Sequence, residues 1–299
     1  MSGSRIYNCL IITGQDIFMR FKLVFRVEED TFFPFNYQYE LAAGLYKLFM
    51  LIKQNHPRYT YLKNHDFLNQ ITFSRIEIPK RVITKEGIKC FSDFVFLKVS
   101  LGFNDIASDA IWKAFSKMNN QLLIYKKQAN GPMQVINMQL YEVEFFPPPE
   151  FEETMKFKML SPLVLTKNSK AKKNKFCSLQ EQDLILERLK DSLSEKFQLL
   201  YGHLPPIEEF EFQFDELYCQ DRQEKDLYSL IKMKEGSGHP FSVLGILVPF
   251  KITAPQEVIK VGYYSGFGEK TSLGFGMVES AYRVLPRRDP QDKNEVPHL

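Results

Sequence analysis

The stretch from Met19 to Arg26 alternates polar and apolar side chains, which is the pattern of a β-strand with one buried face. After a break at residues 31–34, apolar side chains recur every three or four positions, which predicts a helix capped by Asn36. The apolar face of this helix is expected to contain Tyr39, Ala42, Ala43, Tyr46, Phe49, Met50 and Ile52. The chain therefore begins with a strand followed by a helix.

Further segments continue this pattern as far as residue 146. Ile71 to Ile78 alternates again, Asp93 to Val99 is rich in Phe and Val, and Met133 to Phe146 supplies a last strand. Asn104 or Asp105 is expected to cap a second helix that runs through Phe115. The resulting order of strand, helix, strand, strand, helix, strand is that of the ferredoxin-like motif.

Three prolines at residues 147–149 then interrupt the pattern, because proline cannot continue a strand ladder. Beyond them, strands are predicted at Thr154–Leu160, Pro162–Thr166, Glu209–Phe214, Ser242–Thr253 and Met277–Arg283, and helices at Leu179–Leu200 and Pro255–Val261. These elements give the second half the same βαββαβ order as the first. No residue identity between the halves is visible, so any repeat is one of architecture.

The pattern therefore predicts an α+β protein with two tandem ferredoxin-like (βαββαβ, RRM-like) domains. We place the domains at residues 19–146 and 151–285, joined by a proline-rich linker at residues 147–150. Residues 1–18 are expected to form an extension outside the fold, since the first convincing strand begins at Met19. Residues 286–299 are expected to be a flexible tail.

Composition narrows the class of protein. The chain has 299 residues, 44% of them hydrophobic, and a formal net charge of only +3, so a nucleic-acid site would have to come from local clustering of charge. No apolar run reaches the roughly 20 residues of a membrane span, and the start does not resemble a signal peptide. We expect a cytoplasmic protein without membrane contact.

Cysteine and histidine spacing argues against a metal enzyme. The four cysteines lie far apart without a CxxC pair, and the five histidines show no HxxxH or HExxH spacing. The expectation is a protein with no bound metal and no cofactor.

The densest glycine cluster lies at residues 262–279, which contain five of the fifteen glycines. A P-loop is excluded because Glu269 separates Gly268 from Lys270, and a dinucleotide fingerprint is excluded because Thr271 stands at the third glycine position. Glycine allows positive φ and close approach, so this segment could aim its N–H groups at phosphate oxygens, with Lys270 adding a charge. The alternative is a glycine-tolerant turn between two strands.

A second candidate for phosphate contact is a cluster of lysines after the strand predicted at Pro162–Thr166. The cluster consists of Lys167, Lys170, Lys172, Lys173 and Lys175. Such a run is usually a solvated loop, but lysines that neutralise phosphates also give salt-sensitive RNA binding. Phe94 and Phe96 resemble the stacking aromatics of an RNA-recognition sheet only superficially, and we expect them to be buried.

The glycine cluster is also where the sequence resembles a known family. Residues 260–278, with their two Gly-Phe-Gly triplets around Glu-Lys-Thr-Ser-Leu, are similar almost position by position to the C-terminal signature of the CRISPR-associated endoribonucleases that process repeat RNA, members of the RAMP superfamily. Weaker similarities occur at residues 36–39, 160–164, 201–202 and 209–211. The resemblance covers nearly all of Met19 to Glu279 and implies two tandem ferredoxin-like domains.

The resemblance also implies an activity. Family members cut CRISPR repeat RNA into guide RNA without metal: the 2′-hydroxyl attacks the adjacent phosphate and leaves 2′,3′-cyclic phosphate and 5′-hydroxyl ends. That reaction needs a base, an acid and a cation, roles that His, Tyr and Lys can fill. RNA contacts are expected from the lysine cluster and from Gly266, Gly268, Lys270, Ser272, Gly274 and Gly276.

The catalytic positions are less clear than the family. Tyr46 falls at the matching position of the first helix, although its spacing also suits core packing. At the position of the family histidine this chain has Lys63, and His65 lies two residues further on. The candidate catalytic residues are therefore Tyr46, Lys63 and His65, with His56, or no histidine at all, as alternatives.

The departure at Lys63 keeps a second interpretation open, an inactive repeat RNA-binding protein of the same superfamily. A third is a subunit packed along guide RNA in an effector complex. The partner in each case is CRISPR repeat RNA. The sequence does not distinguish a monomer from a homodimer.

Overall fold

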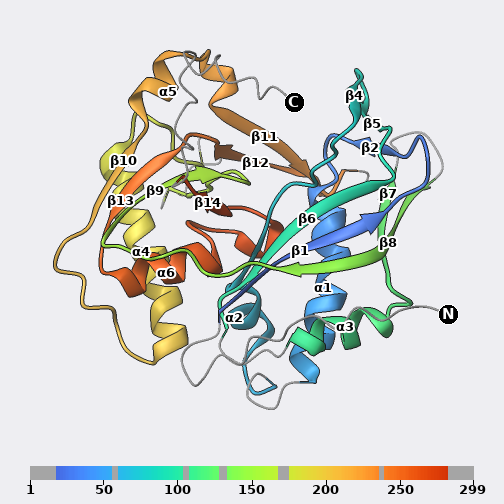
Figure 1. The fold of residues 1–299 in the computed structure, drawn as a ribbon. Coiled ribbons are helices and arrows are strands. Elements are labelled where there is room, and N and C mark those ends of the chain that lie inside the picture. The colour runs from blue at the N-terminus through green and yellow to red at the C-terminus, as the bar shows by residue number, and fades with distance from the viewer. Residues whose placement is uncertain are drawn as a thin grey trace, which may run out of the picture.

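The computed structural model describes residues 18–55, 60–103, 108–127, 133–167, 175–235 and 239–281 (Figure 1). Two antiparallel sheets of five and four strands, each with its own helices, account for most of the described chain. The predicted tail at 286–299 and residues 1–17 of the predicted extension lie outside the described residues. Phe18 is buried, and its ring stacks on Tyr264 at 4.8 Å, so this residue belongs to the fold.

The first sheet has the strand order β3-β6-β1-β8-β7. Its elements are β1 (Met19–Arg26), α1 (Gln38–Gln54), β3 (Ile71–Phe73), β6 (Phe94–Leu101), α3 (Ser108–Ser116), β7 (Gln121–Lys127) and β8 (Met133–Phe145). Apart from the edge strand β7, the sheet has four strands. Read across the sheet, they are the second, third, first and fourth of these strands in the sequence. This is the arrangement of a βαββαβ unit, because each helical connection crosses over one neighbouring strand.

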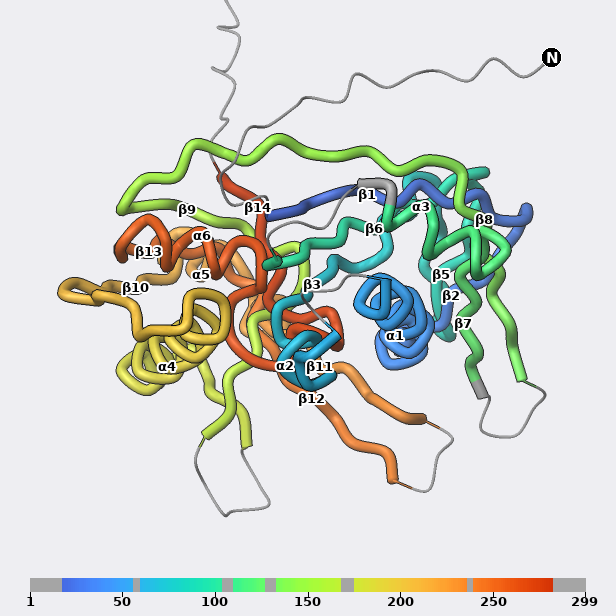
Figure 2. The backbone as a smooth tube through the Cα atoms, turned by 90° about the horizontal axis from the view of Figure 1, so that it is seen from below, coloured from blue at the N-terminus to red at the C-terminus, as the bar shows by residue number. Residues whose placement is uncertain are grey.

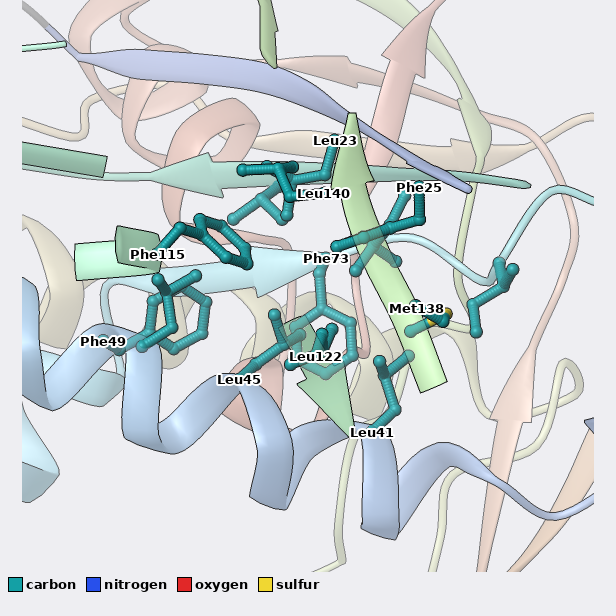
Figure 3. Close-up of a cluster of buried hydrophobic side chains, with 14 of the residues drawn as sticks. Leu23, Phe25, Leu41, Leu45, Phe49, Phe73, Phe115, Leu122, Met138 and Leu140 are labelled. Carbon is teal, nitrogen blue, oxygen red and sulfur yellow. The ribbon is translucent and has the colours of Figure 1, made fainter. Parts of the chain in front are cut away.

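The core of the first half lies between this sheet and α1. Leu41, Leu45 and Phe49 of α1 point toward Phe73 and Phe115, next to side chains of β1, β7 and β8 (Figure 3). All five side chains are at most 1% exposed. The helix is therefore held by burial of one apolar face.

The second sheet has the order β10-β13-β9-β14. Its elements are β9 (Thr154–Met159), α4 (Gln182–Tyr201), β10 (Glu211–Phe214), β13 (Phe250–Thr253), α6 (Gln256–Ser265) and β14 (Val278–Ser280). In chain order these strands again lie as second, third, first, fourth. The predicted fold class, α+β with two ferredoxin-like units, is confirmed.

Several smaller elements extend the two units. A three-stranded sheet combines β2 (Phe32–Pro34), β5 (Gly87–Cys90) and β4 (Arg81–Ile83), and a hairpin combines β11 (Tyr228–Met233) and β12 (Phe241–Ile246). The short helices are α2 (Asn64–Leu68) and α5 (Glu216–Gln220). In both views α2 lies between α1 and α4 (Figure 1, Figure 2). No helix among the described residues is long and apolar enough to cross a membrane.

Three predictions for the first half are wrong in detail. Asn36 does not cap α1: its side chain donates to Glu235 Oε1 and accepts from the Lys232 N–H, so it holds β11 instead. The strand predicted to reach Ile78 ends at Phe73, because the Arg75 N–H bonds to Leu160 O in the second half. β7 was not predicted at all.

The buried face of α1 also differs from the prediction. Ala43 and Tyr46 are exposed, whereas Leu41, Leu45 and Leu48 are fully buried. The three leucines follow the same spacing of three and four as the predicted set, shifted around the helix. The sheet selects this stripe because leucine buries more apolar surface than alanine or the amphipathic tyrosine.

In the second half, the long strand predicted at Ser242–Thr253 is two strands in different sheets. Pro249 lies between them and has no N–H for a ladder, and β12 pairs with β11 whereas β13 pairs with β9 and β10. Residues 162–166, also predicted as a strand, form only isolated bridges. α6 is longer than expected and continues through Ser265 into the glycine cluster.

Candidate nucleic-acid interface

The glycine segment, residues 266–277, follows α6 and leads into β14. Four of its glycines have positive φ, a backbone conformation that residues with a side chain rarely adopt. They are Gly266 (84°), Gly268 (78°), Gly274 (79°) and Gly276 (73°). All four are buried, as are the phenylalanines between them, Phe267 and Phe275.

Close packing explains why the segment has no larger residues at these positions. A Cβ on Gly274 would overlap Gln38 and Phe73 of the first half, and one on Gly276 would overlap the backbone of Phe267. Gln38 Nε2 in turn donates to the carbonyls of Leu273 (2.8 Å) and Gly274 (2.9 Å). The segment is therefore wedged against the start of α1 and against β3.

This burial corrects the expectation that the loop offers its N–H groups to phosphate. The N–H of Phe267 donates to Gly276 O, that of Gly274 to Thr271 O and that of Gly276 to Pro162 O, at 2.8–2.9 Å. These groups are already used within the protein. The positive-φ glycines position the segment, and its partly exposed part is limited to a crest.

The crest consists of residues 269–273 and includes the 3₁₀ turn Thr271–Leu273. Glu269, Lys270, Ser272 and Leu273 are partly exposed there. Lys270 has φ 58°, in the left-handed region, so its backbone is held in an unusual turn. Of the expected RNA contacts in the glycine cluster, Lys270 and Ser272 are the two whose side chains lie on this accessible part.

The crest is hydrogen-bonded to α2, the helix that carries His65. Thr271 Oγ1 donates to Asn69 O at 3.3 Å, and Asn69 Nδ2 lies 3.4 Å from both ring nitrogens of His65. The His65 side chain is 81% exposed. Its imidazole is therefore open to solvent, and it is linked to Thr271 of the crest through Asn69.

α1 is tied to α2 from the other side. Lys53 Nζ, on the last turn of α1, donates to Asn64 Oδ1 of α2 at 2.9 Å. Tyr46 precedes Lys53 by seven residues and Tyr39 precedes Tyr46 by seven, so the three lie on one side of the helix. Tyr39 packs against the apolar cluster that also contacts Leu273 of the crest.

Tyr46 therefore lies on the side of α1 that meets the crest at one end and α2 at the other. It is 43% exposed, so the interpretation of Tyr46 as a core residue is wrong. Lys63 precedes α2 and is exposed. The structure thus brings together the elements that carry Tyr46, Lys63, His65 and Lys270, whereas the alternative His56 lies outside the described residues.

A further contact joins the crest to Thr166, the residue directly before the lysine cluster. Glu269 Oε1 accepts from the Thr166 N–H (2.9 Å), and both Glu269 oxygens accept from Thr166 Oγ1. Lys167 follows directly but forms an ion pair with Glu181 at 2.6 Å, and Lys175 is exposed. The remaining lysines of the cluster, Lys170, Lys172 and Lys173, lie outside the described residues.

Sequence reasoning missed Lys196 of α4. Its Nζ donates to the carbonyls of Gly266 (2.6 Å) and Gly268 (2.7 Å), and the residue is only 7% exposed. Burial lowers the pKa of Lys196 to about 7, against the opposing effect of Glu269 and Glu195. The sequence does contain a signal for this residue. Lys196 occupies a position on the apolar face of α4, between Leu193 and Phe197, where a hydrophobic residue would be expected.

Other possible sites are few. Within the described part of the chain, no three or more His, Cys, Asp or Glu side chains are grouped so as to hold a metal ion. A pocket of about 240 Å³ lies between α1 and β7. It is lined by Glu40, Ala43, Gly44, Lys47, Met118, Gln121, Leu123 and Tyr125. It therefore includes none of the predicted catalytic or RNA-binding side chains.

Comparisons with known proteins agree with this arrangement. Residues 146–280 match the family described as CRISPR associated protein Cas6, C-terminal. The chain is 26% identical over 268 residues to CRISPR-associated endoribonuclease Cas6 1 of Methanocaldococcus jannaschii, covering 87% of this chain and 92% of that protein. It is 28% identical over 258 residues to a putative CRISPR-associated endoribonuclease-like protein Cas6 of Pyrococcus furiosus, covering 85% and 94%.

Solved structures give the same result. A structure described as a Cas6-related gene from Pyrococcus furiosus superposes with a TM-score of 0.67 at 25% identity, covering 89% of this chain and 99% of that one. Another, titled an RAMP protein binding different RNA substrates, has the same score and identity and covers 88% and 99%. The structural similarity therefore covers most of the chain, and the family match at residues 146–280 includes the glycine segment.

Proposed function

We propose that this chain is a member of the Cas6 family and an endoribonuclease that cuts CRISPR repeat RNA into guide RNA. The relatives named as CRISPR-associated endoribonucleases align over more than four fifths of the chain, with both ferredoxin-like units included. That extent favours an RNA-cleaving protein of the same organisation. The proposed substrate is a repeat transcript, and the proposed product is a guide RNA.

The observation that carries the proposal is the contact between the crest and α2. Thr271 holds the carbonyl of Asn69, and the Asn69 side chain lies beside the His65 ring. A phosphate near Lys270 would therefore lie close to an exposed imidazole. Positioning a charged group and a proton-transfer group around one phosphate is the main requirement of this reaction.

The proposed reaction needs no metal. The 2′-oxygen forms a bond to the adjacent phosphorus while the bond from phosphorus to the 5′-oxygen breaks, so the products carry 2′,3′-cyclic phosphate and 5′-hydroxyl ends. One group removes the proton from the 2′-hydroxyl and another supplies a proton to the leaving 5′-oxygen. His65 and Tyr46 are proposed for these proton transfers, and Lys63 and Lys270 for stabilising the negative charge of the phosphorane.

Cleavage of the repeat transcript from the protein's own host, in the presence of EDTA, tests the proposal. We expect a single defined cut whose upstream fragment ends in a 2′,3′-cyclic phosphate. Loss of cleavage on chelation, with return on adding Mg²⁺, would contradict the metal-free mechanism. Tight binding of the transcript without any cut would instead support the inactive RNA-binding protein.

A further inference from the structure

The two sides of the first sheet differ in how they are covered. On the side away from α1, Phe94 and Phe96 are only partly buried, so the expectation that both are buried is wrong. On the side of α1, the edge strand β7 lies beside the helix (Figure 2). The pocket of about 240 Å³ opens between α1 and β7 at this edge.

The pocket results from small residues on one side of α1. Glu40, Ala43, Gly44 and Lys47 follow one another at helical spacing and line it together. Ala43 and Gly44 leave space that longer side chains would fill. A Cβ at Gly44 would lie 3.0 Å from Leu123 O, so helix and strand already approach each other closely here. The hollow is therefore fixed by the way in which α1 packs against β7.

The wall of the pocket combines an aromatic ring with separated polar groups. Tyr125 of β7 is 51% exposed, and Gln121 of the same strand adds an amide. Glu40 and Lys47 are seven residues apart on α1, which places the two residues about 10 Å apart along the helix axis. The pocket thus offers a hydrogen-bond acceptor and a donor two helical turns apart, with a ring between helix and solvent.

The Glu40 carboxylate lacks a full set of hydrogen-bond partners. The residue is 9% exposed, and within the described part of the chain its Oε2 atom has no partner. Its Oε1 atom accepts from Lys126 Nζ at 3.3 Å, but that ammonium group also bonds to Glu235 Oε2 (3.0 Å) and to Asn36 O (2.6 Å). Burial raises the pKa of Glu40, against the opposing effects of its own N–H and of Lys126. A ligand that donates N–H groups to this carboxylate would offset the cost of its burial.

We propose that the pocket binds an unpaired guanine base, with Tyr125 against the ring, Glu40 accepting from its N–H groups and Lys47 donating to O6 or N7. Guanine is the base that offers two adjacent donors, N1–H and the 2-amino group, together with two acceptors at its major-groove edge. Stacking on aromatic side chains and hydrogen bonds to base edges are the usual means of binding unpaired RNA bases. The volume lies below the roughly 300–1,000 Å³ of a pocket for a drug-sized ligand, which suits one base with ribose and phosphate outside.

The pocket lies close to the proposed cleavage site. Ala43 precedes Tyr46 by three residues and Lys47 follows it directly, so the lining residues form a strip next to the Tyr46 side of α1. The two strips are separated by no more than the width of one helix, about 10–12 Å. The inference deepens the proposed function and rests on it in one respect: the guanine belongs to the repeat RNA, near the bond that is cut.

Two fluorescein-labelled 2′-O-methyl RNA probes of about 12 nucleotides test the assignment on the full chain. Each consists of uridines with one central guanosine or one central inosine, and neither has the attacking 2′-hydroxyl. Inosine lacks the 2-amino group, so it loses one of the two proposed bonds to Glu40. We expect fluorescence anisotropy to show about 5-fold tighter binding of the guanosine probe. Equal affinity for the two probes would overturn the proposal, and this comparison needs no variant.

Two variants locate the preference in the pocket. Ala43→Leu fills the pocket from an exposed position of α1, where leucine suits the helix. This variant should bind the two probes with equal affinity. Glu40→Gln should lose the preference as well, because one of the two acceptor oxygens becomes a donor. A preference for guanosine that persists in both variants would place its recognition elsewhere and overturn the proposal.

Gln54→Leu is the matched control. Gln54 is also exposed on α1, but it does not line the pocket. The new leucine should leave the preference for guanosine unchanged. Loss of the preference in this variant too would count against the pocket.

GMP distinguishes a free nucleotide from a base within RNA. Thermal stabilisation of the protein by GMP that Ala43→Leu abolishes, without any preference between the two RNA probes, would assign the pocket to a free nucleotide. That result would overturn the inference, because the proposed ligand is a base of the repeat RNA.

The two proposals fail in different ways. If the protein prefers the guanosine probe and loses this preference in Ala43→Leu, but does not cut the repeat transcript, the proposed cleavage is wrong and guanine binding stands. If it cuts the transcript and shows no preference between the probes, guanine binding is wrong and the proposed cleavage stands.

Discussion

At the scale of single residues, Lys196 shows how one buried side chain can fix a loop. Its ammonium group holds two carbonyls of the glycine segment, and Ser192 Oγ donates to one of them, Gly268 O, at 2.8 Å. Without these donors the carbonyls would be buried and unpaired, which costs about 1–3 kcal/mol for each group. A cation on an otherwise apolar helix face is thus explained by the loop that it faces.

Lys196 also predicts a pH dependence of stability. Its pKa falls from 10.5 to about 7 on burial, so between these values the unfolded chain binds a proton that the folded chain lacks. The contribution of this group to the free energy of unfolding should therefore rise with pH over that window, by at most about 1.4 kcal/mol per pH unit. Urea unfolding of the protein and of Lys196→Met at several pH values measures it.

The variant is expected to lose this part of the pH slope, because methionine cannot titrate. Identical slopes for the two proteins would show that the lysine keeps its proton in the folded state over the whole window.

At the scale of elements, the glycine segment connects parts of the chain that are far apart in sequence. It contacts the start of α1 through Gln38, β3 through the bond from Thr72 Oγ1 to Phe275 O, and α4 through Lys196. These contacts require the backbone of the glycine segment to lie very close to its neighbours. A side chain on a tightly packed glycine, such as Gly274, should therefore disrupt them.

Gly274→Ala tests this close approach. The substitution should destabilise the protein by more than the about 1–2 kcal/mol that a left-handed residue costs, because the new methyl group also overlaps Gln38 and Phe73. Gly202→Ala is the matched control, since Gly202 has nearly the same φ, 78°, but nothing within 4 Å of its Cβ position. Chemical denaturation measures both, and equal losses of stability would show that the approach at Gly274 is not tight.

Elements were predictable from the sequence where one physical rule decided them. Alternation identified β1, and periodicity identified α1 and α4, because each buries one regular face. Prediction failed where distant contacts decided the outcome: Arg75 ends β3 by bonding to the second half, and Asn36 is engaged by β11 rather than by its own helix. The sequence did not decide whether Tyr46 is buried or exposed. The apolar residues of α1 form two overlapping faces, one with Ala43 and Tyr46 and the other with Leu41, Leu45 and Leu48, and both have helical spacing.

At the scale of the whole molecule, the two sheets have the same strand order. The glycine segment contacts elements of both units. The crest meets Asn69, which follows α2 in the first unit, through Thr271, and it meets Thr166, which precedes the lysine cluster in the second unit, through Glu269. The sequence predicted the glycine cluster as the RNA-binding feature and assigned the phosphate contact to its glycines. In the structure the N–H groups of Gly274 and Gly276 are already bonded within the protein. We therefore propose that the segment acts by placing α2 and that side chains around it contact the RNA.

The central claim is that the glycine segment supports cleavage by positioning His65, and a double-mutant cycle of Thr271→Val and His65→Ala tests it most directly. The measured quantity is the single-turnover rate of repeat RNA cleavage at saturating protein. We expect His65→Ala to lose about 100-fold or more and Thr271→Val alone to lose about 10-fold. The double variant should be no slower than His65→Ala, because the contact through Asn69 acts on that ring; losses that simply multiply, or a Thr271→Val rate equal to that of the unmodified protein, would contradict the account.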